Sequence, residues 1–160
     1  MSVPVHHLNC ATINVFGGTA LIGTGGLLAC ASGVTHCILV ETDDGLLLVD
    51  TGLGVRDYTA PSFIMRVFLA MMGSPRDLAE TASAQVERLG DAPEDVRHIA
   101  LTHFHFDHAG GLLSDYREDR PLQLLFPNAI FVVSARAWAR AIEPHPRDRA
   151  SFVPRLHELL

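Results

Sequence analysis

The chain has 160 residues, of which 48% are apolar and 19% charged, so residues 1–160 are expected to be one packed domain, or a piece of one, and not a disordered chain. Its net charge of −6 excludes a nucleic-acid backbone as the main partner, because such binding depends on basic surface. All twelve cationic residues are Arg, so chemistry that needs a Schiff-base or phosphate-binding lysine is excluded as well.

The cysteines and the first glycine-rich stretch bear on the compartment. Cys10, Cys30 and Cys37 form no C-x-x-C pair, so we expect small buried side chains in a reducing cytoplasm rather than a disulfide framework. Residues 15–34 carry no charge and could span a bilayer or serve as an export signal. Their six glycines, and the lack of a preceding Lys or Arg, favour loops between short strands, so we expect no membrane partner.

The first elements predicted along the chain are strands. Val5–Leu8 and Thr12–Phe16 are short β-rich runs. The clearest local signal is a hairpin of His36–Thr42 and Leu46–Asp50, joined at the turn residues Asp43-Asp44-Gly45. The second of these strands is apolar without alternation, and we therefore expect it to be covered on both faces.

A glycine turn and two helices follow the hairpin. Residues 50–54, Asp-Thr-Gly-Leu-Gly, permit a tight turn out of the sheet. Pro61–Met72 is predicted to be a helix with Pro61 in its first turn, and its apolar residues go nearly all the way round. We expect this helix to be buried, with a lid over an apolar substrate pocket or a dimer contact as alternatives. Asp77–Leu89 is an amphipathic helix that Gly90 can cap.

The second half of the chain alternates in the same way. After a turn at Pro93, the strand Val96–Leu101 leads into a cluster of His and Asp residues. Two more β-rich runs and two helices are predicted at Leu122–Phe126, Ala129–Val133, Ser134–Ile142 and Arg149–Leu160. Strands that alternate with helices indicate an α/β layered domain.

The segment after Val96–Leu101 holds four candidate metal ligands within six residues. His103 and His105 occupy alternate positions of an extended segment, so their imidazoles can project the same way and meet one ion. Asp107 and His108 come where the chain must turn, before Ala109-Gly110-Gly111, and can point to a second ion. Imidazole and carboxylate ligands suit zinc, and also iron, cobalt or manganese. Two such ions, about 3.5–4 Å apart, can hold a hydroxide and polarise a carbonyl or phosphoryl oxygen.

This pattern resembles a known family. H-x-H-x-D-H followed by A-G-G, at residues 103–111, is similar to the metal-binding motif of the metallo-β-lactamase superfamily. His36–Glu41 and Leu48–Gly52 resemble the early hairpin and D-T-G turn of that family, and Phe126–Ala129 resembles the strand entry after its metal loop. Leu8–Asn14 is similar to the lactonase-like branch, which includes acyl-homoserine-lactone lactonases.

The resemblance implies a role for each matching residue. His103 and His105 would bind the first metal, and Asp107 and His108 the second, with two zinc ions in a complete site. Asp107 would also donate a proton to the leaving group. Asp50 would orient a ligand imidazole or hold the D-T-G turn in place, and the alternative that it only closes a turn stays open. Position 105 disfavours the flavo-diiron branch because it is not Glu, and position 108 disfavours one branch of true β-lactamases because it is not Arg.

Ligand counting predicts that the site is incomplete within this sequence. A hydrolytic zinc usually has about three protein ligands, so two ions need more than four side chains. The family supplies the remainder further along the chain, and it packs two sheets between helices in an αββα sandwich. The resemblance implies that this chain is the first half of that sandwich, a mixed sheet with flanking helices. We therefore expect the N-terminal portion of a longer protein, with one apolar sheet face uncovered. His145 and His157 are weaker ligand candidates, and the remaining histidines are expected to be strand or surface residues: His6, His7, His36 and His98.

The predicted activity is metal-dependent hydrolysis of a small molecule with a carboxylic ester bond. Lactones come first and thioesters second, and an acyl tail on the substrate would suit the apolar helix. A metal-bridging hydroxide would attack the carbonyl while Asp107 assists departure of the alcohol. Two alternatives stay open, a non-catalytic N-terminal fragment of such an enzyme and a mononuclear-iron sulfur dioxygenase of the same superfamily. A homodimer is also left open.

Overall fold

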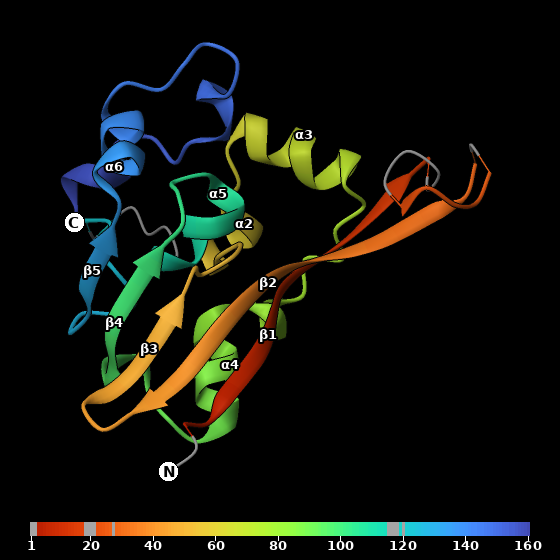
Figure 1. Cartoon of the computed structure of the whole chain (residues 1–160). Coiled ribbons are helices and arrows are strands. Elements are labelled where there is room, and N and C mark those ends of the chain that lie inside the picture. The colour runs from red at the N-terminus through yellow and green to blue at the C-terminus, as the bar shows by residue number, and fades with distance from the viewer. Residues whose placement is uncertain (1–2, 18–21, 27, 115–118, 120) are drawn as a thin grey trace.

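The computed structural model describes residues 3–17, 22–26, 28–114, 119 and 121–160. Their strands form one five-stranded sheet whose spatial order follows the chain (Figure 1). β1 to β3 are antiparallel to one another, whereas β3, β4 and β5 are parallel, so the predicted mixed sheet is confirmed. The strands are β1 Val5–Phe16, β2 Cys30–Thr42, β3 Gly45–Val49, β4 Val96–Leu101 and β5 Ile130–Val133.

The first two strands are longer than predicted. β1 is one strand rather than two, and a shift of register between Asn9 and Thr12 marks the interval between the predicted runs. β2 begins six residues before the predicted start at His36 and turns into β3 at the predicted hairpin, where Thr42 pairs with Gly45. The distal ends of β1 and β2 extend beyond the sheet as a two-stranded ribbon (Figure 1).

The sheet is well covered on one face only. Leu46 and Leu48 of β3 are buried, whereas Leu47 and Val49 between them are half-buried, so the prediction that this strand is covered on both faces is wrong. The buried face packs against α4 and the segments after β4. On the opposite face, in the part of the chain that the structure describes, apolar side chains such as Ile130 and Val132 are 63% and 54% exposed. The expected uncovered face is therefore present, although the helix-covered face has a packed core.

The helices are α2 Val55–Thr59, α3 Phe63–Met71, α4 Ala82–Leu89, α5 Phe106–Ala109 and α6 Ala135–Ile142. Pro61 precedes α3 instead of lying in its first turn, because the Ser62 hydroxyl caps the helix by accepting a hydrogen bond from the Met65 amide at 3.2 Å. The predicted burial of this helix is wrong for most of it: Met65 and Leu69 are buried, whereas Phe63 is 73% exposed. The lid and dimer-contact alternatives for α3 stay predictions.

The predicted helix Asp77–Leu89 consists of two pieces. A 3₁₀ turn at Leu78–Glu80 precedes α4, and Thr81 between them has an extended backbone. Gly90 ends α4 in the left-handed region at φ +100°, as predicted.

The second half differs from prediction in two segments. Ser134 caps α6 as expected, since its hydroxyl accepts a hydrogen bond from the Ala137 amide at 3.1 Å. Residues 122–126 form no strand and contribute only a single bridge, Leu113 to Leu124. Residues 149–160 form two 3₁₀ turns instead of a helix, because Pro154 between them has no amide hydrogen to donate.

Cysteine burial follows the prediction at two of three positions. Cys10 and Cys37 are buried, but Cys30 at the start of β2 is exposed. Residues 18–21 and 27 of the charge-free stretch lie outside the described residues, and the rest of it contains the end of β1 and the start of β2. Among the residues described, no helix has the length and apolar character needed to cross a bilayer.

Candidate metal centre

The predicted ligand cluster lies where two parallel strands end side by side. Asp50 follows β3 and Thr102 follows β4, and the Asp50 amide donates a hydrogen bond to the Ala100 carbonyl at 2.9 Å. α5, which carries Asp107 and His108, sits directly beyond these strand ends (Figure 1). In open α/β sheets the carboxyl ends of parallel strands are the usual place for a ligand site.

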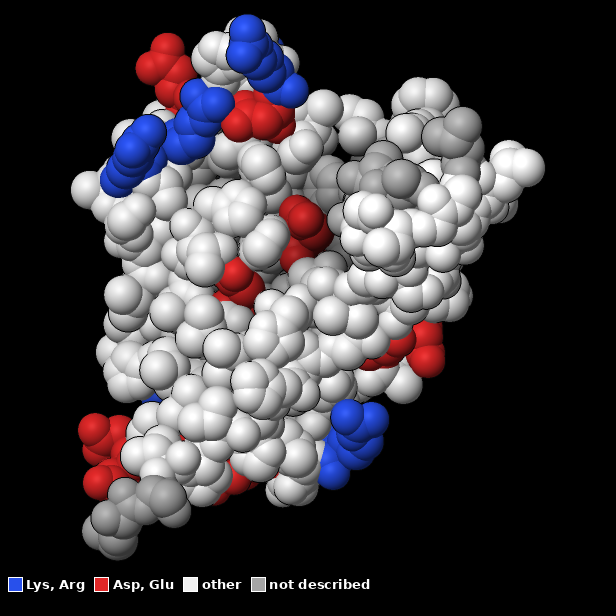
Figure 2. All heavy atoms as spheres, turned by 45° about the vertical axis from the view of Figure 1, so that its right-hand side comes forward, with Lys and Arg blue, Asp and Glu red and all other residues white. Residues whose placement is uncertain are grey.

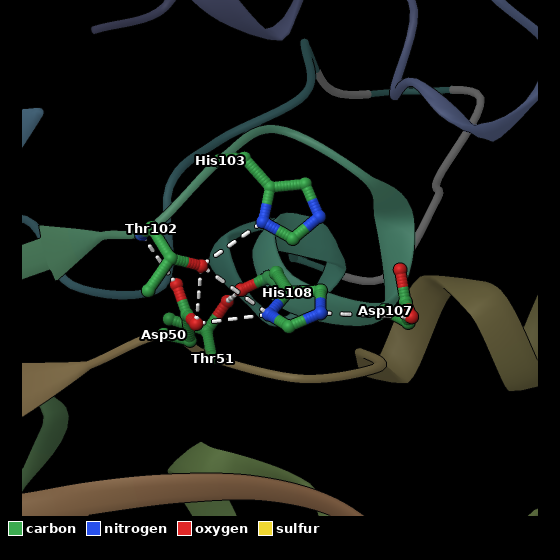
Figure 3. A network of polar contacts seen from close by, with 6 residues as sticks. All are labelled: Asp50, Thr51, Thr102, His103, Asp107 and His108. Carbon is green, nitrogen blue, oxygen red and sulfur yellow. Dashed lines mark hydrogen bonds and ion pairs between the residues drawn. The ribbon is translucent and has the colours of Figure 1, made fainter. Parts of the chain in front are cut away.

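Asp50 is a buried carboxylate at the base of this cluster. Its residue is 4% exposed, and its backbone is in the left-handed region at φ +56°, which Asp tolerates better than most residues. The carboxylate accepts hydrogen bonds from the Thr102 amide at 2.8 Å and the Thr102 hydroxyl at 2.7 Å, and it lies 2.8 Å from His108 Nδ1 (Figure 3). Asp50 therefore holds the strand end and one imidazole together.

This network sets which ring nitrogen each histidine presents. His108 Nδ1 must carry its proton to donate to Asp50, which leaves Nε2 as the atom free to bind a metal. The Thr102 hydroxyl gives its one proton to Asp50 and lies 3.0 Å from His103 Nδ1, so it accepts from that nitrogen. His103 then also presents Nε2. One buried carboxylate thus orients two imidazoles, the second through Thr102.

The D-T-G turn is hydrogen-bonded to the loop that carries the predicted ligands. The Thr51 amide and hydroxyl both donate to the His108 carbonyl, at 2.7 and 3.0 Å. The Gly111 amide donates to the Gly52 carbonyl at 2.9 Å. A Cβ atom on Gly111 would overlap the Thr51 carbonyl oxygen, and Gly52 has a positive φ of 65°. These glycines allow the turn and the loop to approach backbone to backbone.

Three of the four predicted ligands come together around a common point. His103, Asp107 and His108 each offer a ligand atom, and these atoms lie within 4.8 Å of one another. His108 Nε2 is 3.7 Å from Asp107 Oδ2, and the His103 and His108 ring centroids are 4.1 Å apart (Figure 3). Two imidazoles and a carboxylate form a donor set that zinc and related divalent ions accept, so these residues fit such an ion.

His105 stands at the edge of this group. Its ring centroid lies 4.5 Å from that of His103, but no His105 nitrogen belongs to the three-residue group above. The ring packs edge-on against Phe152 at 4.7 Å, and its Nε2 lies 3.8 Å from Asp148 Oδ2. The site residues remain predictions as metal ligands, and the structure gives His105 different neighbours from the other three.

Electrostatics favour neutral His103 and charged Asp50. Burial lowers the pKa of His103, and the neighbouring His108 and His105 lower it further, so the ring is available as a ligand. Burial by itself would raise the pKa of Asp50, but hydrogen bonds from His108 and Thr102 outweigh it and lower the pKa. The hydrogen bond to Asp50 raises the pKa of His108. Protons therefore compete with a metal more strongly at His108 than at His103.

The weaker candidates lie elsewhere. His145 Nδ1 accepts a hydrogen bond from the Arg147 amide at 3.2 Å, and the His157 ring faces Trp138 at 6.2 Å. Neither belongs to the three-residue group. The remaining histidines lie on the strands as expected: His6, His7, His36 and His98.

Sequence reasoning missed two residues of this site. Thr102 immediately precedes the motif, and its place at a strand end beside Asp50 was the available signal. Asp148 lies 43 positions after His105 in a loop that no periodic pattern describes, so nothing local pointed to it.

Comparisons with known proteins agree with this geometry. Residues 32–114 match the model that describes the metallo-beta-lactamase superfamily. A probable metallo-hydrolase of Mycobacterium tuberculosis is 40% identical over 151 residues, covering 94% of this chain and 41% of the relative. An N-acyl homoserine lactonase of a Bacillus species is 36% identical over 76 residues, covering 47% of this chain and 30% of the relative. The chain thus spans less than half the length of these curated relatives.

A solved structure shows the same fold. The crystal structure of a probable metal-dependent hydrolase from Staphylococcus aureus superposes with a TM-score of 0.72 at 25% identity, covering 94% of this chain and 53% of that one. The sheet and helices described above therefore correspond to about half of the known two-sheet fold, as the sequence predicted.

Proposed function

We propose that this chain, which belongs to the metallo-β-lactamase superfamily, supplies the metal-binding part of a hydrolase that cleaves carboxylic esters, lactones first and thioesters second. The observation that carries the proposal is the group His103, Asp107 and His108, whose two imidazoles are both oriented by Asp50. The similarity to N-acyl homoserine lactonases of Bacillus supports the lactone over other esters.

In this proposal His103 and His105 hold one ion, Asp107 and His108 hold the other, and the ions are zinc. Bound divalent ions would lower the pKa of a water molecule and polarise the substrate carbonyl. Asp107 would bind metal as a carboxylate, take up a proton released by the attacking water and pass it to the departing alcohol, a role that suits a side chain which is 38% exposed and can meet substrate. Asp50 keeps its charge and holds His108 in one tautomer.

A cavity beside the cluster supports a substrate with an acyl tail. It has a volume of 280 Å³ and lies between α2, α3 and residues 149–154. Met65 and Ile64 of α3 line one side, Phe152 and Val153 line another, and Phe106 adjoins Asp107. Arg56, Asp57 and Arg149 also line the cavity, so it combines charged groups with apolar walls. Such walls next to the proposed catalytic residue would suit a short hydrocarbon chain attached to the scissile ester.

Three further proposals follow from the sequence. Residues 1–160 form part of a single domain, and the buried Cys10 and Cys37 are suited to a reducing cytoplasm. The exposed apolar residues of α3, such as Phe63, would serve a homodimer contact if they do not cover substrate.

The test is an activity panel on the full-length protein with lactone, thioester and phosphodiester substrates, together with metal analysis. We expect His103→Ala to lose metal and lactone hydrolysis together, while the exposed strand residue changed in His36→Ala retains both. Full activity in His103→Ala would end the proposal. If the protein binds metal but hydrolyses only the phosphodiesters of the panel, the proposed substrate class changes from carboxylic esters to phosphodiesters.

A further inference from the structure

His105 is held by a different part of the chain from the other predicted ligands. Its backbone pairs with Phe152 in an isolated antiparallel bridge, and its ring packs at 84° against the Phe152 ring. The segment that follows α6 therefore forms one wall of the site. Figure 2 shows that charged side chains of both signs gather over this end of the molecule.

Asp148 lies in this segment and faces the His105 ring. Its Oδ2 atom is 3.8 Å from His105 Nε2 and accepts a hydrogen bond from Arg140 Nη2 at 2.8 Å. Although the side chain is 30% exposed, its Oδ1 atom is buried and has no hydrogen-bond partner among the residues described. A buried acceptor without a donor is uncommon and needs an explanation.

The backbone fixes the place of this carboxylate. The Asp148 amide donates to the His145 carbonyl at 3.1 Å, and the Ser151 amide donates to the Asp148 carbonyl at 2.8 Å. Arg140 comes from α6, whose first turn Ser134 caps. The turn at residues 145–151 and the ion pair with Arg140 of α6 thus hold Asp148 beside the His105 ring.

We propose that Asp148 is a positioning residue for His105, whose Nε2–H it accepts so that Nδ1 is presented to a metal. The inference rests on the proposed metal centre, and it repeats with a second carboxylate what Asp50 does for His108. In metal sites a carboxylate behind a ligand imidazole fixes its tautomer and ring orientation. His105 Nε2 lies 3.8 Å from Asp148 Oδ2, the atom that already accepts from Arg140, so the proposal requires a small rotation of the Asp148 side chain that shortens this separation to hydrogen-bond length.

The rival explanation is that Asp148 serves only as a partner for Arg140. An exposed ion pair of this kind contributes little to stability. Arg155 and Glu158 provide a comparison, because they form a similar pair, at 2.6 Å, that does not involve any of the four predicted ligands. Glu158→Gln is therefore the control for losing an Arg-bound carboxylate near the C-terminal end of the described chain.

The experiment measures metal rather than turnover. Zinc affinity of the full-length protein is determined by competition with a chromophoric chelator for the wild type, Asp148→Asn, Arg140→Gln and Glu158→Gln. We expect Asp148→Asn to weaken binding about 10–100-fold, a range typical for carboxylates behind ligand imidazoles, with the other two within about threefold of wild type. Equal losses in Asp148→Asn and Arg140→Gln, or no loss in either, would overturn the proposal.

A second readout needs no variant. Nitrogen-15 NMR of the metal-free protein reports the tautomer of His105, and we expect the proton on Nε2. A proton on Nδ1 would contradict the role of Asp148 even if the variants fail to fold. Because neither readout uses an ester, failure to hydrolyse lactones would remove the substrate proposal without touching this one.

Discussion

The two sides of the histidine cluster are supported in different ways. On one side Asp50 is buried at the end of β3 and bonds Thr102 and His108 at 2.7–2.8 Å. On the other side Asp148 lies in a loop after α6, is part-exposed, and approaches His105 at 3.8 Å. Asp50 is held by hydrogen bonds at the end of a sheet strand, whereas Asp148 lies in a loop segment that packs against His105.

This difference separates stability from ligand orientation. Removing Asp50 would take the acceptor from the half-exposed donors of Thr102 and His108 and leave a gap where the buried carboxylate was, so we expect a loss of stability as well as of ligand orientation. Removing Asp148 would leave Arg140 in solvent, where it can be hydrated. The sheet side is therefore expected to be rigid before a metal binds, and the loop side to matter chiefly for the metal.

The largest expected effect is that of Asp50→Ala. Loss of three hydrogen bonds to a buried carboxylate should lower the free energy of unfolding by about 3–5 kcal/mol. Urea unfolding of the metal-free protein measures it, with Asp148→Ala as the comparison, expected to change stability far less. Equal destabilisation by the two variants would remove the distinction between the two sides.

Gly111→Ala tests the backbone contact that supports the sheet side. Because the added methyl group would meet the Thr51 carbonyl oxygen, which hydrogen-bonded strand ends hold in place, we expect a loss of about 3 kcal/mol. Gly26→Ala is the control, since no atom lies within 4 Å of a Cβ there. A thermal midpoint unchanged in Gly111→Ala would show that the turn and the loop can separate freely.

Asp57 predicts a pH dependence on the same side. Burial raises its pKa to about 6, against the hydrogen bond that the Gly54 amide donates to it. A raised carboxyl pKa means that the folded protein binds more protons than the unfolded chain, so stability is lost as pH rises from about 4 through 6. The change should not exceed about 3 kcal/mol, because the shift is from 3.8 to about 6. Asp57→Asn should flatten the stability profile in that window, and a profile identical to wild type would contradict the assignment.

The smallest effect concerns the loop side. Ser134→Ala removes the cap of α6, the helix that carries Arg140, and should cost about 1 kcal/mol. Hydrogen exchange should quicken at the first amides of α6 while β3 and β4 keep their protection. Quickened exchange across the whole sheet would mean that the two sides unfold as one unit.

Local sequence patterns predicted the hairpin, β4, the D-T-G turn and the cluster at residues 103–108 because each depends on near neighbours or on a compact motif. These local patterns gave wrong predictions where contacts between residues far apart in the sequence determine the structure. Residues 149–160 look amphipathic, yet Pro154 interrupts a helix and Phe152 instead packs on His105. Asp148 could not be found because its partner is distant in sequence, and the alternation missing from β3 did not reveal which face would be open.

The open face of the sheet has a practical consequence. Ile130 and Val132 lie on β5, an edge strand whose outer backbone groups pair with no strand among the described residues. Apolar side chains beside an unpaired edge make a template for adding strands from other molecules. A preparation of residues 1–160 by itself is therefore expected to bind hydrophobic dyes and to aggregate at high concentration. Its aggregation state must be measured before any affinity determined on it is interpreted.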